Sequence, residues 1–410
     1  ESLQPENTTA DSTQMIPVVE AIASPLMSAV GRGVTNAWND PSNLAYLLLQ
    51  SCKIGRISQD DEEIYVERSG LEQRIDDHVR EESPSSYLVV VGPRGGGKTT
   101  AVKKMLMGRG KVVHLKLTAE IQTIHARLRG KLGIPSDEPF ELEDAFKAFE
   151  GLHGVDKPVL VVEIDSNVSS KTVKEQSQEL KILCTDAKLA HGILILSDAN
   201  ATFKLNTDED RQEILWITDL DENEMNALLD KFGILPKDDP DSAALRRRLW
   251  NEVGANAQGL VKMAKKARKA AGEAGARAAA GSAAERGVVE RYIEEKQQDA
   301  FYGVHNLLTT IPIDKDTRLR LPNERWSLLS LTAALDRTPG GVKIKDTGVL
   351  PLNLSIAVKP TGCGALTYNG EGKRFQFYSK AHQHAARRWL KRRRIRHVSF
   401  LIRLLVLCLV

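Results

Sequence analysis

Short apolar runs alternate with longer stretches of helical spacing in the first half of the chain. Runs of this length, bounded by glycine, proline or charged residues, predict strands buried on both faces. Because strands alternate with helices, we expect an α/β fold with a parallel sheet and helices on both faces. The predicted strands are 87–91, 111–117, 158–164, 192–196 and 213–217, and the predicted helices begin at 98 and cover 118–132, 141–150 and 171–190.

The pattern changes after Asp219, where helical spacing replaces the apolar runs. Three helices are expected over 222–232, 242–253 and 257–271, and Leu228, Leu229 and Phe232 should face the other two. Residues 271–287 are rich in alanine and glycine, which fits a frayed helix or a linker. We therefore expect a small helical lid that follows the α/β core.

The last third of the chain combines helices with a hairpin. A helix is expected over 326–335, and strands at 365–368 and 374–378 flank Asn369-Gly370-Glu371-Gly372, a favourable turn sequence. Another helix should begin at Lys380. Helices followed by a small hairpin predict a winged-helix-like domain. The N-terminal extension at 1–57 is expected to be partly disordered, with one or two helices packed on the next domain. The other predicted units are a P-loop core at 58–220, a lid and linker at 221–287, a winged-helix-like domain at 288–390, and a tail at 391–410 that is first basic and then apolar.

Composition adds little about partners. The 410 residues are 41% hydrophobic and 27% charged, which is ordinary for a globular protein, and a net charge of +3 does not imply nucleic-acid binding. The four cysteines lack metal-binding spacing, so we expect reduced thiols and an intracellular protein of the cytoplasm, nucleus or mitochondrion. Since the chain starts at Glu1 rather than Met, we expect the true N-terminus, with any targeting peptide, to lie upstream.

A glycine-rich loop between the first strand and the following helix carries the clearest chemistry. Its glycines allow backbone N–H groups to surround phosphate oxygens, and the next helix directs its positive end at the same anion. We expect Lys98 to face solvent and reach the β and γ phosphates of ATP, and Thr99 to bind Mg²⁺. A chance glycine-rich turn is the alternative, which the strand before and the helix after disfavour. The loop consists of Gly92, Pro93, Arg94, Gly95, Gly96, Gly97, Lys98 and Thr99, followed by Thr100.

Two acids end the third predicted strand. Glu163 and Asp165 lie on one side of an extended chain, separated by Ile164. Either carboxylate could hold the water shell of Mg²⁺ while the other polarises the attacking water. The alternative is a pair of solvated acids with slow or absent hydrolysis.

Two further positions are candidates for catalysis. Asp198, in Ser197-Asp198-Ala199-Asn200, follows the fourth strand and could contact the γ-phosphate or orient water, or belong to a simple turn. Arg211 precedes the fifth strand and could act on ATP in a neighbouring subunit of a homo-oligomer, or be an ordinary surface arginine.

The basic run 387–396 could bind nucleic acid or an anionic membrane, or be solvated. The apolar end, 400–410, is too short to span a bilayer.

Taken in order, these elements resemble an AAA+ ATPase, and within that superfamily the archaeal-ATPase and STAND branch and its fungal relatives, which carry a C-terminal winged helix. The box Glu67-Arg68-Ser69-Gly70-Leu71-Glu72 before the first strand is similar to one in that branch. The loop is also similar to that of the mitochondrial escape protein family. The chain departs from the pattern in its Glu163-Ile164-Asp165 acids and in a lid turn, Gly254-Ala255-Asn256-Ala257, without proline.

The resemblance implies a protein that couples ATP binding or hydrolysis to a conformational change, with nucleotide between core and lid and near Tyr65–Arg68. A protein partner would contact the winged-helix-like domain. A non-hydrolysing nucleotide-gated scaffold and a DNA-binding ATPase of the origin-recognition type are the alternative functions.

Overall fold

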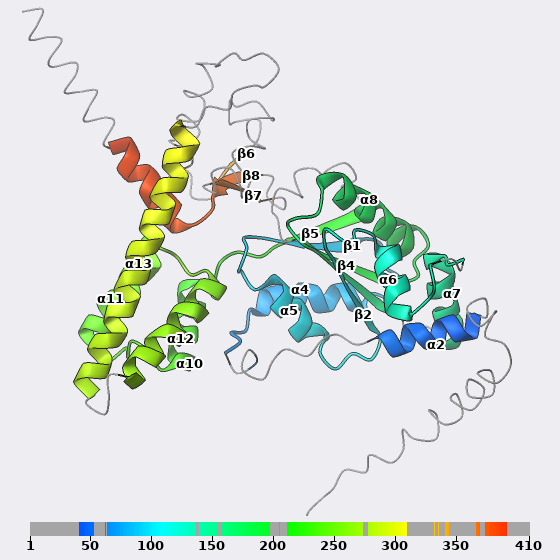
Figure 1. Ribbon diagram of the computed structural model, residues 1–410, viewed down its shortest axis with the longest axis horizontal. Coiled ribbons are helices and arrows are strands. Elements are labelled where there is room, and N and C mark those ends of the chain that lie inside the picture. The colour runs from blue at the N-terminus through cyan, green and yellow to red at the C-terminus, as the bar shows by residue number, and fades with distance from the viewer. Residues whose placement is uncertain are drawn as a thin grey trace, which may run out of the picture.

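The computed structural model places most of the core, the lid and part of the C-terminal unit (Figure 1). Among the helices of the part of the chain that the structure describes, none is both long enough and apolar enough to cross a membrane. The structure describes residues 41–52, 62, 64–136, 139–153, 157–196, 205, 211–273, 278–309, 332, 335, 341–343, 366–369 and 374–391.

A five-stranded parallel sheet forms the core, in the order β2-β3-β4-β1-β5. Every strand begins and ends within one residue of its prediction, which confirms the α/β class. β4 lies between β1, which leads into the glycine loop, and β3, which ends at the acids. The carboxyl ends of β1 and β3 therefore lie on the same edge. The strands are β1 (Tyr87–Val91), β2 (Val112–Leu117), β3 (Val159–Ile164), β4 (His191–Leu196) and β5 (Gln212–Trp216).

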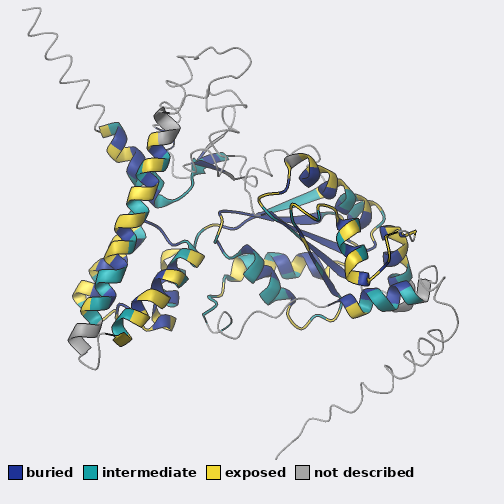
Figure 2. Ribbon diagram, in the orientation of Figure 1, coloured by how far each residue is buried: buried dark blue, intermediate teal, exposed yellow. Residues whose placement is uncertain are grey.

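Helices cover both faces of the sheet (Figure 1), and the inner strands β1, β3 and β4 are almost entirely dark blue, or buried, in Figure 2, whereas the edge strand β5 is largely teal. Alternate residues of β1 separate the two layers. Leu88 and Val90 pack with α4 (Ser69–Arg80) and α5 (Lys98–Leu106). Tyr87, Val89 and Val91 belong to the larger opposite cluster, which includes α2 (Pro41–Ser51), α6 (Ile124–Leu132), α7 (Leu142–His153) and α8 (Ser170–Leu180). The expected packing of an N-terminal helix on the core is therefore confirmed by α2.

Two helices of the core are shorter than the pattern predicts. The helix expected over 118–132 begins only at Ile124, because the Thr123 hydroxyl accepts a hydrogen bond from the Ala126 N–H and caps it. The helix expected over 171–190 ends as α8 at Leu180 and continues as the π-helical turn η3 (Lys181–Asp186).

Three helices form the lid: α10 (Glu222–Phe232), α11 (Pro240–Glu252) and α12 (Ala257–Glu273). Asp221 and Glu224 cap α10 reciprocally, each side chain accepting from the other residue's backbone N–H at 2.8 Å. Leu228, Leu229 and Phe232 are all buried in the lid cluster, as predicted.

The long helix α13 (Ala278–Thr309) corrects the predicted linker and boundary. It packs on α12 and α11, and its residues Val289 and Ile293 are fully buried in the lid cluster. Of the segment 271–287, residues 271–273 are thus the end of α12 and residues 278–287 are the start of α13. A domain boundary between 287 and 288 would divide α13. Apolar packing against the lid, rather than local composition, explains its length.

A second, small sheet lies near the carboxyl-terminal end of α13 (Figure 1). The predicted hairpin is confirmed by β7 (Leu366–Asn369) and β8 (Arg374–Phe377), and β6 (Val342–Lys343) adds a strand beside β8. The predicted C-terminal helix covers 380–391 and buries Trp389. The helix predicted at 326–335 lies outside the described residues except for Thr332 and Leu335, as do residues 392–410.

Two buried histidines at the amino end of β4 give the core an expected dependence on pH. His78 Nε2 donates to the Gly192 carbonyl oxygen at 3.1 Å, and the His191 ring lies 6.2 Å away. Burial lowers the pKa of His78, and burial, then the neighbouring His78, lowers the pKa of His191 to about 4. Glu81 and Glu213 partly oppose the shift at His78, whereas Lys157 and Arg109 add to the shift at His191.

Folding lowers the pKa values of both histidines, so the folded protein binds fewer protons than the unfolded chain at acidic pH. Above pH 6.5 both rings are neutral in either state, and no stability is lost. The free energy of unfolding should fall as the pH drops from about 6.5 toward about 4, by about 3 kcal/mol for His191. Denaturant melts at pH 7.5 and pH 5 should show a smaller difference in His191→Asn than in wild type. His305→Asn, at an exposed histidine, serves as control. An unchanged difference in His191→Asn would place the pH dependence elsewhere.

Candidate functional site

The glycine loop turns sharply between β1 and α5, and two of its glycines are needed there. Gly92 has φ +152°, and a Cβ at this position would lie 2.1 Å from the Ile217 carbonyl oxygen. Gly97, at the N-cap of α5, has φ +89°. The loop thus follows the backbone path that sequence reasoning expected, with the positive end of α5 directed at it. The chain therefore has the core of an α/β P-loop nucleotide-binding protein.

Lys98 is buried rather than facing solvent as predicted. Its side chain is 7% exposed, and Nζ donates to the carbonyl oxygens of Gly92 at 3.0 Å and Pro93 at 2.9 Å. The ammonium group is satisfied by the loop's own carbonyls, which explains why it folds back. Its charge still lies within the loop, where phosphate oxygens would be held.

Thr99 and Glu163 meet at the carboxyl edge of the sheet. The Thr99 hydroxyl donates to Glu163 Oε1 at 3.2 Å, and His114 Nε2 lies 3.5 Å from Glu163 Oε2, an ion-pair distance rather than a good hydrogen bond. The His114 imidazole is the largest influence that lowers the pKa of the Glu163 carboxyl, against the opposing effect of burial. Glu163 is therefore an ionised carboxylate beside the hydroxyl expected to bind Mg²⁺.

Asp165 takes a different position from Glu163. Its backbone N–H donates to the Leu117 carbonyl oxygen at 3.1 Å, and Ser166 Oγ donates to its carboxylate at 3.2 Å. Its side chain is half-buried, and no contact with Thr99 is present among the described residues. The acid that the structure brings to Thr99 is thus Glu163. Asp198 lies outside the described residues.

Three other candidates lie at or beyond the edge of the site. Thr100 is the third residue of α5 and is half-buried, whereas Arg94 of the loop is exposed. Arg211 forms an ion pair with Asp186 of its own chain, and both side chains are nearly half exposed. Its role toward a neighbouring subunit stays a prediction.

The lid is hydrogen-bonded directly to the loop through Asn256. Asn256 Nδ2 donates to the Arg94 carbonyl oxygen and to Asp219 Oδ1, both at 3.0 Å. The Gln258 N–H also donates to the Gly95 carbonyl oxygen at 2.9 Å. The sequence marks this lid turn by its lack of proline, and the polar Asn256 within it is the signal for the contact.

Arg68 connects the same loop to the lid from the N-terminal side. Its guanidinium donates to the carbonyl oxygens of Gly96 at 3.4 Å and Thr218 at 3.2 Å, and it forms an ion pair with Glu224 of α10 at 3.4 Å. The Glu67–Glu72 box marks Arg68 in the sequence. The partners of its guanidinium are 28 to 156 residues away along the chain, so the sequence alone does not reveal them.

The donors present fit Mg²⁺ bound together with a nucleotide. Within the described ranges, no three His, Cys, Asp or Glu side chains gather as a metal cage. Magnesium typically keeps several waters and takes few protein ligands alongside substrate phosphates. A hydroxyl at Thr99 and an ionised carboxylate at Glu163 supply such a partial set.

No protein-family model matches the chain, and no curated protein matches it. Among solved structures it is similar to a Walker-type ATPase of Pyrococcus abyssi, with 11% identity, a TM-score of 0.46, and coverage of 82% of this chain and 99% of that one. It is also similar to the ORC1 protein of Aeropyrum pernix in complex with DNA, with 14% identity, a TM-score of 0.39, and coverage of 83% and 95%. A structure on katanin self-assembly matches with 14% identity, a TM-score of 0.34, and coverage of 61% and 90%. Similarity at this level says nothing about activity.

Proposed function

We propose that the chain is an AAA+-type P-loop ATPase in which Mg²⁺·ATP binding or hydrolysis moves a helical lid. The observation that carries this proposal is the hydrogen bond from Thr99 to Glu163, at the edge where the P-loop and the acidic strand end. A hydroxyl at the start of the loop helix and a neighbouring carboxylate are the pair that P-loop proteins use for Mg²⁺. The three lid helices after Asp219 support the AAA+ assignment over other P-loop folds.

The roles of the residues follow from their positions. The backbone N–H groups of the loop would bind the phosphates, and Lys98 would move from the loop carbonyls to the β and γ phosphates. Thr99 would bind Mg²⁺ directly, and Glu163 would bind one of its waters. Bound Mg²⁺ would neutralise the charge that develops on the phosphates. Asp165 or Asp198 would orient the attacking water.

Contacts between the loop and the lid support the coupling. Arg68 bonds to the loop at Gly96 and to α10 at Glu224, and Asn256 bonds to the loop at Arg94. A phosphate that shifts the loop backbone would therefore change contacts that hold two lid helices. These contacts would connect the nucleotide mechanically to the lid.

A non-hydrolysing nucleotide-gated scaffold is the second candidate. Ile164, 2% exposed, occupies the position where a water-activating glutamate is usual. The same ATP site would then act only as a switch. For either function we propose an intracellular protein that can form a homo-oligomer, with a protein partner at the winged-helix-like domain and nucleic acid or anionic membrane at the basic tail. A DNA-binding, origin-recognition-like role would depend on these last two regions.

Saturating Mg²⁺·ATP should slow hydrogen exchange across the lid, residues 220–270. Nucleotide between loop and lid would hold Arg68 and Asn256 in place, and exchange reports such local opening. The measurement is exchange mass spectrometry with and without ATP, with peptides from α7 as an internal control far from the site. Protection of α7 equal to that of the lid, or none in the lid, would contradict the proposed coupling.

A further inference from the structure

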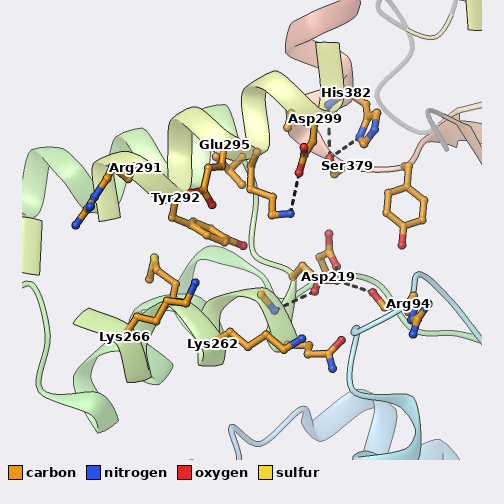
Figure 3. Close-up of a pocket in the computed structure, with 18 of the residues that line it drawn as sticks. Arg94, Asp219, Lys262, Lys266, Arg291, Tyr292, Glu295, Asp299, Ser379 and His382 are labelled. Atoms are coloured by element: carbon orange, nitrogen blue, oxygen red, sulfur yellow. Dashed lines mark hydrogen bonds and ion pairs between the residues drawn. The ribbon is translucent and has the colours of Figure 1, made fainter. Parts of the chain in front are cut away.

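A cavity of about 620 Å³ borders the predicted ATP site and shares Arg94 of the P-loop and Asn256 of the lid turn with it. It is bounded by α12, α13 and residues 378–382, and it reaches the core at Arg94 and Asp219 (Figure 3). Neither Lys98 nor Thr99, which would hold the triphosphate, lines it. Its volume is within the range of small-ligand sites. The cavity therefore extends from the loop, away from Lys98 and Thr99, into a space that the core, the lid and the C-terminal unit share.

The charged side chains of this cavity favour an anion. Lys262 and Lys266 lie one helical turn apart on α12 and are exposed, as are Arg94 and Arg291 from two other elements. In the part of the chain that is described, none of these four cations has an ion-pair partner.

The acids at the cavity are fewer, and most have partners. Asp219 accepts from Asn256 at 3.0 Å, and Asp299 forms an ion pair with Lys296 at 3.2 Å. Glu295 is the third carboxylate of the lining. Asn256 is neutral and cancels no charge, so after the Lys296–Asp299 pair the four cations face two carboxylates, Asp219 and Glu295, and the cavity keeps a net positive charge.

The cavity also has an aromatic and apolar side. Tyr292 projects from α13 into the space above Lys262, as Figure 3 shows, and Met263 and Val288 also line it. Burial raises the pKa of Tyr292 to about 12, so its phenol keeps the proton it can donate. An aromatic surface opposite lysines suits a ligand with a flat body and a phosphate.

We propose that this cavity binds a phosphate-bearing small molecule of nucleotide size, as a second ligand in addition to ATP at the P-loop. Its phosphate would lie beside Lys262 and Lys266, and its body against Tyr292. Such a ligand would contact the loop, α12, α13 and residues 378–382 together. It would therefore stabilise one arrangement of the lid on the core.

The test is isothermal titration of the full chain with Mg²⁺·ADP. Wild type should bind two ADP molecules. Lys98→Ala should keep only the cavity event, and Lys262→Glu/Lys266→Glu should keep only the P-loop event, with cavity affinity lowered at least about tenfold by the reversed charge. Lys265→Glu/Lys269→Glu carries the same charge change at the same spacing on α12 but lies outside the cavity, and should behave as wild type.

Pyrophosphate and adenosine, titrated separately into Lys98→Ala, show which part of the ligand is recognised. Pyrophosphate should compete with ADP, and adenosine should bind much more weakly. One ADP per wild-type chain, unaffected by the Lys262/Lys266 double variant, would overturn the second site while leaving the P-loop proposal intact. Equal ADP binding by wild type and Lys98→Ala at both sites would instead contradict the proposed function. A single-stranded oligonucleotide that binds through these lysines while ADP does not would replace the small ligand with nucleic acid.

Discussion

Lys98→Ala should abolish measurable ATP binding at the P-loop while the protein stays folded. Lys98 is the cation that the loop itself encloses, so its loss leaves phosphate charge without its closest partner. Removing one partner of a buried, hydrogen-bonded charge pair costs about 3 kcal/mol, which is about a hundredfold in affinity. Calorimetry with Mg²⁺·ATP measures this loss.

The control for that variant is Lys103→Ala on the same helix, at a half-buried lysine that does not contact the loop carbonyls. Circular dichroism of both variants should match wild type, because the bonds from Lys98 to Gly92 and Pro93 join it to the loop, whereas α5 and the sheet are held by apolar packing of their own. Unchanged affinity at the P-loop in a folded Lys98→Ala protein would refute the assignment of the site.

The core of the fold could be predicted because its signals are local. An unbroken apolar run such as 87–91 can be buried on both faces only within a covered sheet, and its five residues are all buried. The lid was also predictable, since Leu228, Leu229 and Phe232 repeat at helical spacing. The full length of α13 was not, because alanine in this segment favours a helix whereas its glycines favour a linker, and the burial of Val289 and Ile293 in the lid cluster depends on residues distant in the sequence.

The loop of the candidate site was predictable from its glycines, whereas the partners around it were not. Gly92 and Gly97 have backbone angles that favour glycine, so the motif itself reveals the turn. The position of His114 beside Glu163 was not predicted. Strand alternation places His114 on the same face of β2 as Lys116, and Lys116 pairs with Glu163 on the neighbouring strand β3. The inward fold of Lys98 depends on carbonyl positions that only the three-dimensional loop defines.

Replacing Glu163 by glutamine should keep ATP binding and lose turnover, if the protein hydrolyses ATP. The amide can still accept from Thr99, but it loses the negative charge that holds a magnesium water and that His114 stabilises. Loss of a group that positions or activates water typically costs roughly 10²- to 10⁴-fold in rate. Asp165→Asn should also lose turnover if Asp165 polarises the attacking water. Phosphate release, with nucleotide binding measured in parallel, tests both variants.

Glu141→Gln, an exposed glutamate away from the site, is the matched control and should hydrolyse ATP as wild type does. Loss of turnover in Glu163→Gln alone would assign both the metal and the chemistry to this end of β3 and leave Asp165 as a surface acid. Full activity in both Glu163→Gln and Asp165→Asn would mean that neither acid is catalytic and that the proposed metal site is wrong. A wild-type rate equal to background would favour the non-hydrolysing scaffold, in which the buried Ile164 leaves the attacking water without its usual activating carboxylate.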